Sequence, residues 1–191
     1  MTLEHVFRAA VVLFLMMDPF ASLPVFLTML RHIPAREKAF AANKAALVAG
    51  VTLIVFTIIG PTFLSLIGVS MASFMVGGGI LLLLMSIAMV MGITFGENRE
   101  EKMDVAIVLI AVPLITGPGA MTTATILAAT YGMYDVLLAI VLATAAMWIV
   151  LKCADAIYRF IGPSGNEVLS RISGLLLAAI AVEFIRNGWG V

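Results

Sequence analysis

The feature that most constrains this chain is a polar, proline-broken segment inside its first long apolar stretch, which runs from about Val6 to Leu30. The segment reads Met17-Asp18-Pro19-Phe20-Ala21-Ser22-Leu23-Pro24. A carboxylate at the bilayer centre costs about 2.5–3.5 kcal/mol on insertion scales, so Asp18 is expected to face protein or a wet cavity. Pro19 lacks an N–H, and its ring clashes with the carbonyl four residues earlier, so a helix must kink or restart there. Because Asp favours the N-cap and Pro the first helical position, we expect two half-helices that meet at Asp18.

A second interruption lies in the apolar stretch from Val105 to Ala129 and reads Val112-Pro113-Leu114-Ile115-Thr116-Gly117-Pro118-Gly119-Ala120-Met121-Thr122-Thr123. The glycines relax the backbone, and Pro118 can start a half-helix as Pro19 can. A shift of 99 positions places Pro19 on Pro118. Similar interruptions at corresponding places in two halves of a chain point to the binding site of a transporter.

The composition places the chain in the membrane. Of its 191 residues 63% are hydrophobic and only 12% are charged, and the mean hydropathy is +1.17. Soluble domains have about 25% charged residues. The net charge of zero gives no case for nucleic-acid binding, which needs a basic face. The single Cys153 and the separated His5 and His32 favour neither a disulfide nor a metal site, so we expect no metal and no cofactor.

Six apolar stretches reach the roughly 20 residues that a spanning helix needs. They are residues 6–30, 40–60, 70–94, 105–129, 134–158 and 169–188. We therefore predict an all-α polytopic membrane protein with one transmembrane domain over 1–191, in which the first and fourth helices break near mid-membrane. The charged run 97–104 separates repeat 1, about 1–96, from repeat 2, about 104–191. Three spans is an odd number, so the two repeats are predicted to be inverted.

Short similarities extend the repeat beyond the two proline segments. Ile59-Gly60-Pro61-Thr62 is similar to Ile161-Gly162-Pro163-Ser164, and Gly79-Ile80-Leu81-Leu82-Leu83 is similar to Gly174-Leu175-Leu176-Leu177-Ala178. The triplet Gly77-Gly78-Gly79 lacks the lysine of a phosphate loop, so close helix packing is the interpretation it favours. The apolar stretch between Pro61 and Val69 is interpreted as a short interfacial segment.

The distribution of Lys and Arg predicts the orientation, because short cytoplasmic loops are enriched in both. With the N-terminus outside, only Arg8 and Arg186 fall on the outer side. The cytoplasmic side then receives Arg31, Arg36, Lys38, Lys44, Arg99, Lys102, Lys152, Arg159 and Arg171. Both termini are therefore predicted to lie outside.

The two proline segments resemble the paired signatures of the MarC family, which includes the SnatA-type transporters of small neutral amino acids. The resemblance is carried by Asp18 to Pro24 and Pro113 to Ala120, and it covers essentially the whole chain, since length and span number agree with it as well. Ala21 stands where the family often has Gly, a change between small residues. The resemblance implies a secondary transporter of glycine-like and alanine-like substrates in a bacterial or archaeal inner membrane, coupled to protons.

The residues themselves suggest how a small zwitterion is bound. Its carboxylate needs donors, which the unpaired first N–H groups of a half-helix supply together with the helix dipole. Its ammonium needs acceptors, for which Asp18 and freed carbonyls near Met17 and Ile115 are candidates. The predicted substrate-binding residues are Asp18, Pro19, Phe20, Ala21, Ser22, Thr116, Gly117, Pro118, Gly119, Ala120, Thr122 and Thr123. No catalytic residue is predicted.

Several alternatives stay open at this point. Asp18 either carries the coupled ion or only caps its half-helix, and sodium suits unwound carbonyls as well as a proton suits the carboxyl group. An exporter of drugs or other metabolites is the main alternative function. A membrane-embedded aspartyl protease is disfavoured because it needs two central carboxylates. A purely structural membrane protein would have little use for paired helix breaks. Direction of transport and oligomeric state are not determined by the sequence.

Overall fold

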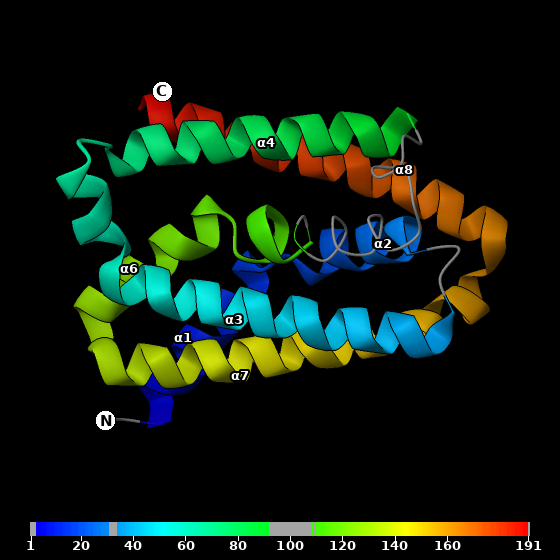
Figure 1. Ribbon diagram of the computed structural model, residues 1–191, viewed down its shortest axis with the longest axis horizontal. Helices are drawn as coiled ribbons and strands as arrows, with labels where there is room; N and C mark the ends of the chain where they lie inside the picture. Colours follow the sequence, from blue (N-terminus) through cyan, green and yellow to red (C-terminus); the bar gives the residue numbers. More distant parts are fainter. Residues whose placement is uncertain (1–2, 31–33, 92–107, 109, 191) are drawn as a thin grey trace.

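The computed structural model describes residues 3–30, 34–91, 108 and 110–190, and these residues form helices and short connections without a β-strand. The order of elements can be followed in Figure 1. The helices are α1 (Leu3–Met16), α2 (Pro19–Met29), α3 (Ala35–Leu66), α4 (Met71–Met91), η1 (Ile110–Ile115), α6 (Pro118–Tyr131), α7 (Met133–Lys152) and α8 (Ala154–Trp189). The predicted junction at 97–104 lies outside the described residues.

Three of the described helices are long and apolar enough to cross a membrane, namely residues Arg36–Leu66, Met71–Ala88 and Met133–Lys152. Their burial pattern fits a lipid environment. On α3 the inward positions carry small residues such as Ala45 and Ala49, whereas large apolar residues such as Leu47 and Val51 are exposed. In a bilayer, burial of large apolar side chains gives no driving force, so helices associate through small residues that allow close approach.

The helices form two outer pairs with interrupted segments between them (Figure 1). α4 packs along α8 on one side, and α3 packs along α7 on the other, where α1 also contacts α7. α2, η1 and α6 lie between these pairs, where α2 contacts α8 and α7, and both η1 and α6 contact α3 and α4. α2, η1 and the start of α6 are therefore covered by helices on two sides, whereas α1 keeps an exposed apolar face that includes Phe7 and Leu15.

Glycines set the close approach of α4 and α8. A Cβ atom at Gly79 would lie 2.8 Å from the Ala181 carbonyl oxygen, and one at Gly188 would lie 2.6 Å from the Ala72 carbonyl oxygen. Residue numbers fall along one helix as they rise along the other, so the two helices are antiparallel. The expected packing role of the glycine triplet is confirmed for Gly79, whereas a Cβ at Gly77 would meet nothing within 4 Å.

The predicted helix boundaries differ from the structure at the end of α3 and at the junction of α7 with α8. Pro61 lies inside α3, which continues to Leu66, so residues 61–66 belong to that helix and form no separate segment. The stretch predicted as 134–158 is divided between α7, which ends at Lys152, and α8, which begins at Ala154. α8 is interrupted at Gly162, which has φ 76° and ψ 173°. Gly60 is helical, so the tetrapeptides that begin at Ile59 and Ile161 are not structurally equivalent.

The turn from α3 to α4 is a Schellman motif, which the sequence analysis did not predict. The Val69 N–H donates to the Leu64 carbonyl at 2.9 Å, and the Gly68 N–H donates to the Ser65 carbonyl at 3.1 Å. Gly68 has φ 72°, the left-handed value that this motif requires. Ser70 then accepts the Ser73 N–H at 3.0 Å through its hydroxyl oxygen, which caps α4.

Gly68→Ala is expected to lower the free energy of unfolding by about 1 kcal/mol, because alanine is strained at a left-handed φ while no neighbour lies within 4 Å of its Cβ. Gly77→Ala is the matched control, since its Cβ is equally free but its backbone is helical, and alanine there is neutral or stabilising. Thermal unfolding in detergent, followed by the fluorescence of Trp148 and Trp189, measures both. Equal midpoints for the two variants would contradict the assigned turn.

Candidate functional site

The chain leaves helical geometry between α1 and α2 at Met17 and Asp18. The Asp18 N–H bonds the Leu15 carbonyl at 3.1 Å, and α2 starts with the bond from the Ser22 N–H to the Asp18 carbonyl at 2.9 Å. Asp18 has φ 47°, and it is the one non-glycine residue with a positive φ in the described part of the chain. Met17 and Pro19 are buried and Asp18 is half-buried. A strained backbone of this kind is held in place by its surroundings and is frequent at functional sites.

The second interruption has a different local form. η1 is a π-helix in which Val112 is extended, with φ −141° and ψ 118°, and the Thr116 N–H bonds the Ala111 carbonyl five residues earlier at 3.0 Å. Gly117 then takes the N-cap position of α6 with φ −69° and ψ 173°, and Pro118 follows as the first helical residue. π-helical turns are rare and are frequently found at functional sites.

Two predicted site hydroxyls are used by the backbone around the interruptions. Ser22 Oγ donates to the Met17 carbonyl at 3.1 Å, and Thr116 Oγ1 donates to the Ala111 carbonyl at 2.6 Å. Both side chains are fully buried. Each hydroxyl therefore donates a hydrogen bond to a backbone carbonyl next to an interruption, where regular α-helical bonding is lost.

Thr116→Val is expected to lower the free energy of unfolding by about 1 kcal/mol, since it removes this buried hydrogen bond and leaves shape nearly unchanged. Thr130→Val is a suitable control, because its hydroxyl also donates to a carbonyl, that of Ile126, but is exposed. Chemical or thermal unfolding in detergent measures the difference. An unchanged midpoint for Thr116→Val would show that the hydroxyl contributes nothing to this backbone turn.

The hydroxyl of Thr122 behaves differently from most threonine hydroxyls in these helices. Thr57 Oγ1 donates to the Leu53 carbonyl and Thr125 Oγ1 to the Met121 carbonyl, each four residues earlier. Thr122 Oγ1 is buried and has no hydrogen-bond partner among the described atoms, a property it shares with Thr144 Oγ1. A buried unsatisfied hydroxyl costs about 1–3 kcal/mol, which makes Thr122 the polar side chain of α6 best suited to bind a ligand.

The two interruptions pack crosswise. α1 contacts α6, and α2 contacts η1, so each half-helix of one segment lies against a half-helix of the other. The structure thus brings the two predicted segments together. Phe20 and Ala21 lie in α2, but their side chains are outside the described part, and Thr123 is half-buried in α6. The remaining predicted residues of the second segment are buried, namely Thr116, Gly117, Pro118, Gly119 and Ala120.

The N-terminus of α6 is held between α4 and α8. A Cβ atom at Gly78 would overlap the Pro118 ring, with Cδ at 2.8 Å, so α4 touches the first residue of α6. A Cβ atom at Gly119 would overlap the Phe184 ring, with Cε1 at 2.7 Å, so α8 touches the second. Sequence reasoning missed both contacts. The only signal was the glycine triplet, which indicates close packing but not its partner.

A second polar cluster lies where α1 meets the turn between α6 and α7. The His5 ring stacks on Tyr131 with centroids 4.7 Å apart, and its Nδ1 lies 3.9 Å from Oδ2 of the buried Asp135. Asp135 lies in the first turn of α7, where the helix dipole stabilises a carboxylate. The sequence separates His5 and Asp135 too widely for any pattern to join them.

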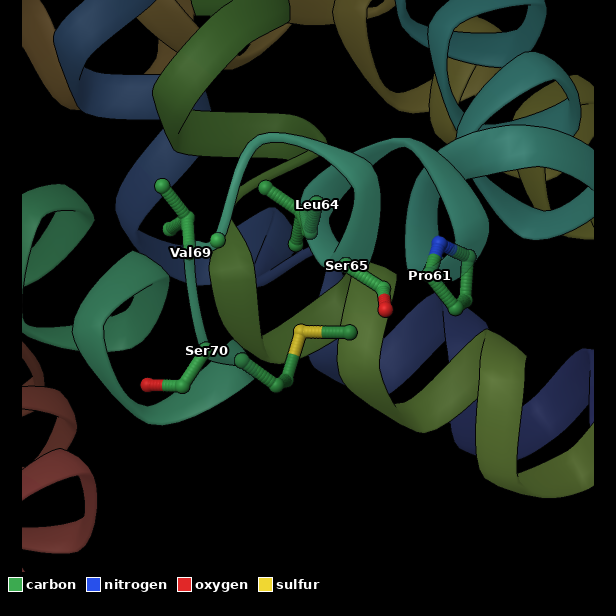
Figure 2. Close-up of a pocket in the computed structure, with 7 residues that line it drawn as sticks. Pro61, Leu64, Ser65, Val69 and Ser70 are labelled. Atoms are coloured by element: carbon green, nitrogen blue, oxygen red, sulfur yellow. The ribbon is translucent and has the colours of Figure 1, made fainter.

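A pocket of about 430 Å³ lies at the corner between α3 and α4 (Figure 2). Figure 2 shows Pro61, Leu64 and Ser65 from the end of α3 beside Val69 and Ser70 from the turn. None of the predicted site residues lines this pocket. It is separate in sequence from both interruptions, and it contains no charged side chain.

Comparison with known proteins identifies the family. Residues 3–190 match the family described as MarC family integral membrane protein. The chain belongs to the MarC family. The family predicted from the two proline segments is therefore confirmed. The chain is an integral membrane protein, and its family has members in bacteria and archaea.

Relatives in the MarC family cover the chain almost completely. A UPF0056 membrane protein of Methanocaldococcus jannaschii is 32% identical over 98% of this chain and 97% of its own length. A UPF0056 membrane protein of Aquifex aeolicus is 31% identical over 95% of this chain and 90% of its own length. The UPF0056 membrane protein YhcE of Escherichia coli is 30% identical, again over 95% and 90%. No solved structure matches the chain.

Proposed function

We propose that this MarC family protein is a secondary transporter of small neutral amino acids such as glycine and alanine, driven by a proton gradient. In this proposal it has six spans in the inner membrane, arranged as two inverted three-helix repeats with both termini outside. The first and fourth spans break near mid-membrane, at Asp18 and Gly117. The substrate binds between the breaks, and the two repeats move against each other to expose it alternately to the two sides.

The contacts between α4 and α8 support the inverted repeat. Gly79 approaches Ala181 and Ile185, and Gly174 approaches Ser86 and Val90. One shift of 95 positions converts the first set of contacts into the second. An antiparallel pair with contacts that exchange in this way is what a two-fold axis between two inverted repeats produces.

Contacts elsewhere exchange in the same manner. Suppose that α1, α2, α3 and α4 correspond in this order to η1, α6, α7 and α8. The contact of α1 with α6 then corresponds to that of η1 with α2. The contact of α1 with α7 corresponds likewise to that of η1 with α3, and that of α2 with α8 to that of α6 with α4. This correspondence favours two structurally similar halves over a coincidental match of two prolines.

The first turn of α6 supports binding of the substrate carboxylate. Its first intrahelical bond joins the Met121 N–H to the Gly117 carbonyl at 3.0 Å, so the preceding N–H groups of Gly119 and Ala120 have no acceptor within the helix. These donors and the positive end of the dipole favour an anion. The buried Thr122 hydroxyl adds one more donor close by in the sequence.

Asp18 supports the other half of the proposal. Its side chain supplies the carboxyl group that an ammonium group needs, at a break where regular helical bonding stops. The Met17 carbonyl, predicted as a second acceptor, already accepts the Ser22 hydroxyl. An ionisable residue inside a membrane segment is a functional candidate by default. We propose that its ionised carboxylate binds the substrate ammonium and that the same group carries the coupled proton when no substrate is bound, so that proton and substrate occupy it in turn.

The observation that carries the proposal is the crosswise packing of two interrupted segments around a helix N-terminus with a buried, unpartnered hydroxyl. Counterflow of labelled glycine and alanine into proteoliposomes tests it, with accumulation under an imposed pH gradient as the second assay. Thr122→Val is expected to reduce glycine counterflow by about tenfold, the effect of one lost hydrogen bond to a charged group. Thr125→Val is the matched control on the same helix, because its hydroxyl already donates to the Met121 carbonyl.

Failure of every small amino acid to exchange in the unmodified protein would overturn the proposed substrate. Equal loss in the Thr122 and Thr125 variants would remove the α6 hydroxyl from the site. Accumulation that follows a sodium gradient at constant pH would replace the proton as the coupling ion.

A further inference from the structure

The ring of Phe184 stands against the backbone of α6 at the place where the proposed carboxylate site begins. A Cβ atom added at Gly119 would overlap the ring and lie 2.7 Å from Phe184 Cε1. The space beside the Gly119 α-carbon is therefore too small for one methyl group while the ring is in this position. Phe184 is partly buried and packs against the apolar core.

The direction of Phe184 on α8 differs from that of its neighbours. Ala181 and Ile185 face α4, because they are the residues that Gly79 approaches. Phe184 instead contacts α6 at Gly119. The residue before Gly119, Pro118, contacts Gly78 of α4. The first turn of α6 is thus contacted by α4 on one side and by α8 on the other, and the contact from α8 is made by an aromatic ring.

We propose that Phe184 sets the upper size limit of the substrate side chain, so that the site accepts amino acids with no side chain or a very small one and rejects branched or long apolar ones. This inference rests on the proposed function. A carboxylate bound to the Gly119 and Ala120 N–H groups places its α-carbon next to the ring. Any side chain directed toward α8 then meets Phe184, and the ring fills the volume that a larger side chain needs.

Position 119 is one of several positions at which the two segments differ in sequence. The shift of 99 positions that places Pro19 on Pro118 places Phe20 on Gly119. The second half therefore has glycine on the half-helix and receives its aromatic group from α8. With no side chain at Gly119, the Phe184 ring is what limits the space beside the first N–H groups of α6.

Phe184→Ala tests the inference, with Val182→Ala as control, since Val182 is an exposed apolar residue of the same helix. Unlabelled leucine and unlabelled glycine are each added as competitors, and the concentration of each that halves counterflow of labelled glycine is measured. The readout is the leucine value divided by the glycine value. Loss of the ring is expected to lower this ratio by at least about tenfold, within the 10–200-fold range that one hydrocarbon group gives in an apolar pocket. Val182→Ala is expected to leave it unchanged. Partial loss of fold affects both amino acids equally and does not move the ratio.

Phe184→Leu provides a second variant that preserves apolar packing and shortens the side chain, and an intermediate ratio is expected for it. Leucine-dependent stabilisation against thermal unfolding, absent from the unmodified protein and present in Phe184→Ala, is the expected binding result. Unchanged ratios in both variants, with glycine exchange intact in the unmodified protein, would overturn the size limit and leave the proposed function standing. An unmodified protein that exchanges no amino acid would overturn both.

Discussion

Gly78→Ala is expected to lower the free energy of unfolding by about 3 kcal/mol and to abolish or strongly reduce the proposed glycine counterflow. The added Cβ would overlap the Pro118 ring, which has no rotamer into which to move and lies at the start of α6. Overpacking of a tight interface costs about 1–3 kcal/mol, and a rigid ring at a helix start puts this case at the upper end. The unfolding midpoint in detergent measures the loss. Gly77→Ala is the control, since its Cβ would meet nothing within 4 Å.

The same contact allows a double-mutant cycle. Pro118→Ala removes Cγ and Cδ, the two ring atoms nearest the added group, and leaves a Cβ at 3.3 Å. Gly78→Ala combined with Pro118→Ala is therefore expected to be more stable than the sum of the two single effects predicts, with a coupling energy of about 1–2 kcal/mol. Strict additivity would show that α4 and α6 do not meet at these residues.

The helix ends at the two interruptions follow from local chemistry, which is why the sequence indicated where they lie. Pro19 and Pro118 cannot donate to a preceding turn, and each is preceded by a residue suited to an N-cap. α2 and α6 accordingly begin at these two prolines. Apolar stretches of adequate length likewise indicated where α3, α4 and α7 lie, although the predicted ends of α3 and the predicted end of α7 are wrong by five or six residues.

Features that depend on contacts distant in sequence were missed. Nothing local assigns Val112 to an extended conformation inside a π-helical turn. The similarity of the segments at Gly60 and Gly162 was misleading, because only Gly162 has a positive φ, and the corresponding turn of the first half uses Gly68. Phe184 gave no signal, since one aromatic residue in an apolar helix usually faces lipid or core. The role proposed for Phe184 rests on its contact with Gly119, which lies 65 positions earlier.

Asp18→Gly and Asp18→Asn are expected to reduce glycine counterflow by at least about tenfold and to abolish accumulation driven by a pH gradient. Loss of a charged partner costs about 1.5–3 kcal/mol of binding, which corresponds to this factor or more. Neither substitution strains the backbone, because glycine adopts φ 47° freely and asparagine tolerates it. Both variants are therefore expected to fold, and their unfolding midpoints in detergent serve as the check.

Asp18→Ala completes this set, because it removes the carboxylate and also forces alanine into a left-handed φ, at a cost of about 1–2 kcal/mol. If Asp18 acts only through its backbone, glycine restores transport that alanine loses, and this outcome would contradict the role proposed for the carboxylate. If Asp18→Asn keeps counterflow but loses accumulation, the carboxylate carries the proton and the ammonium is bound elsewhere. Loss of both activities in well-folded glycine and asparagine variants assigns both roles to one side chain, at the point where two half-helices meet.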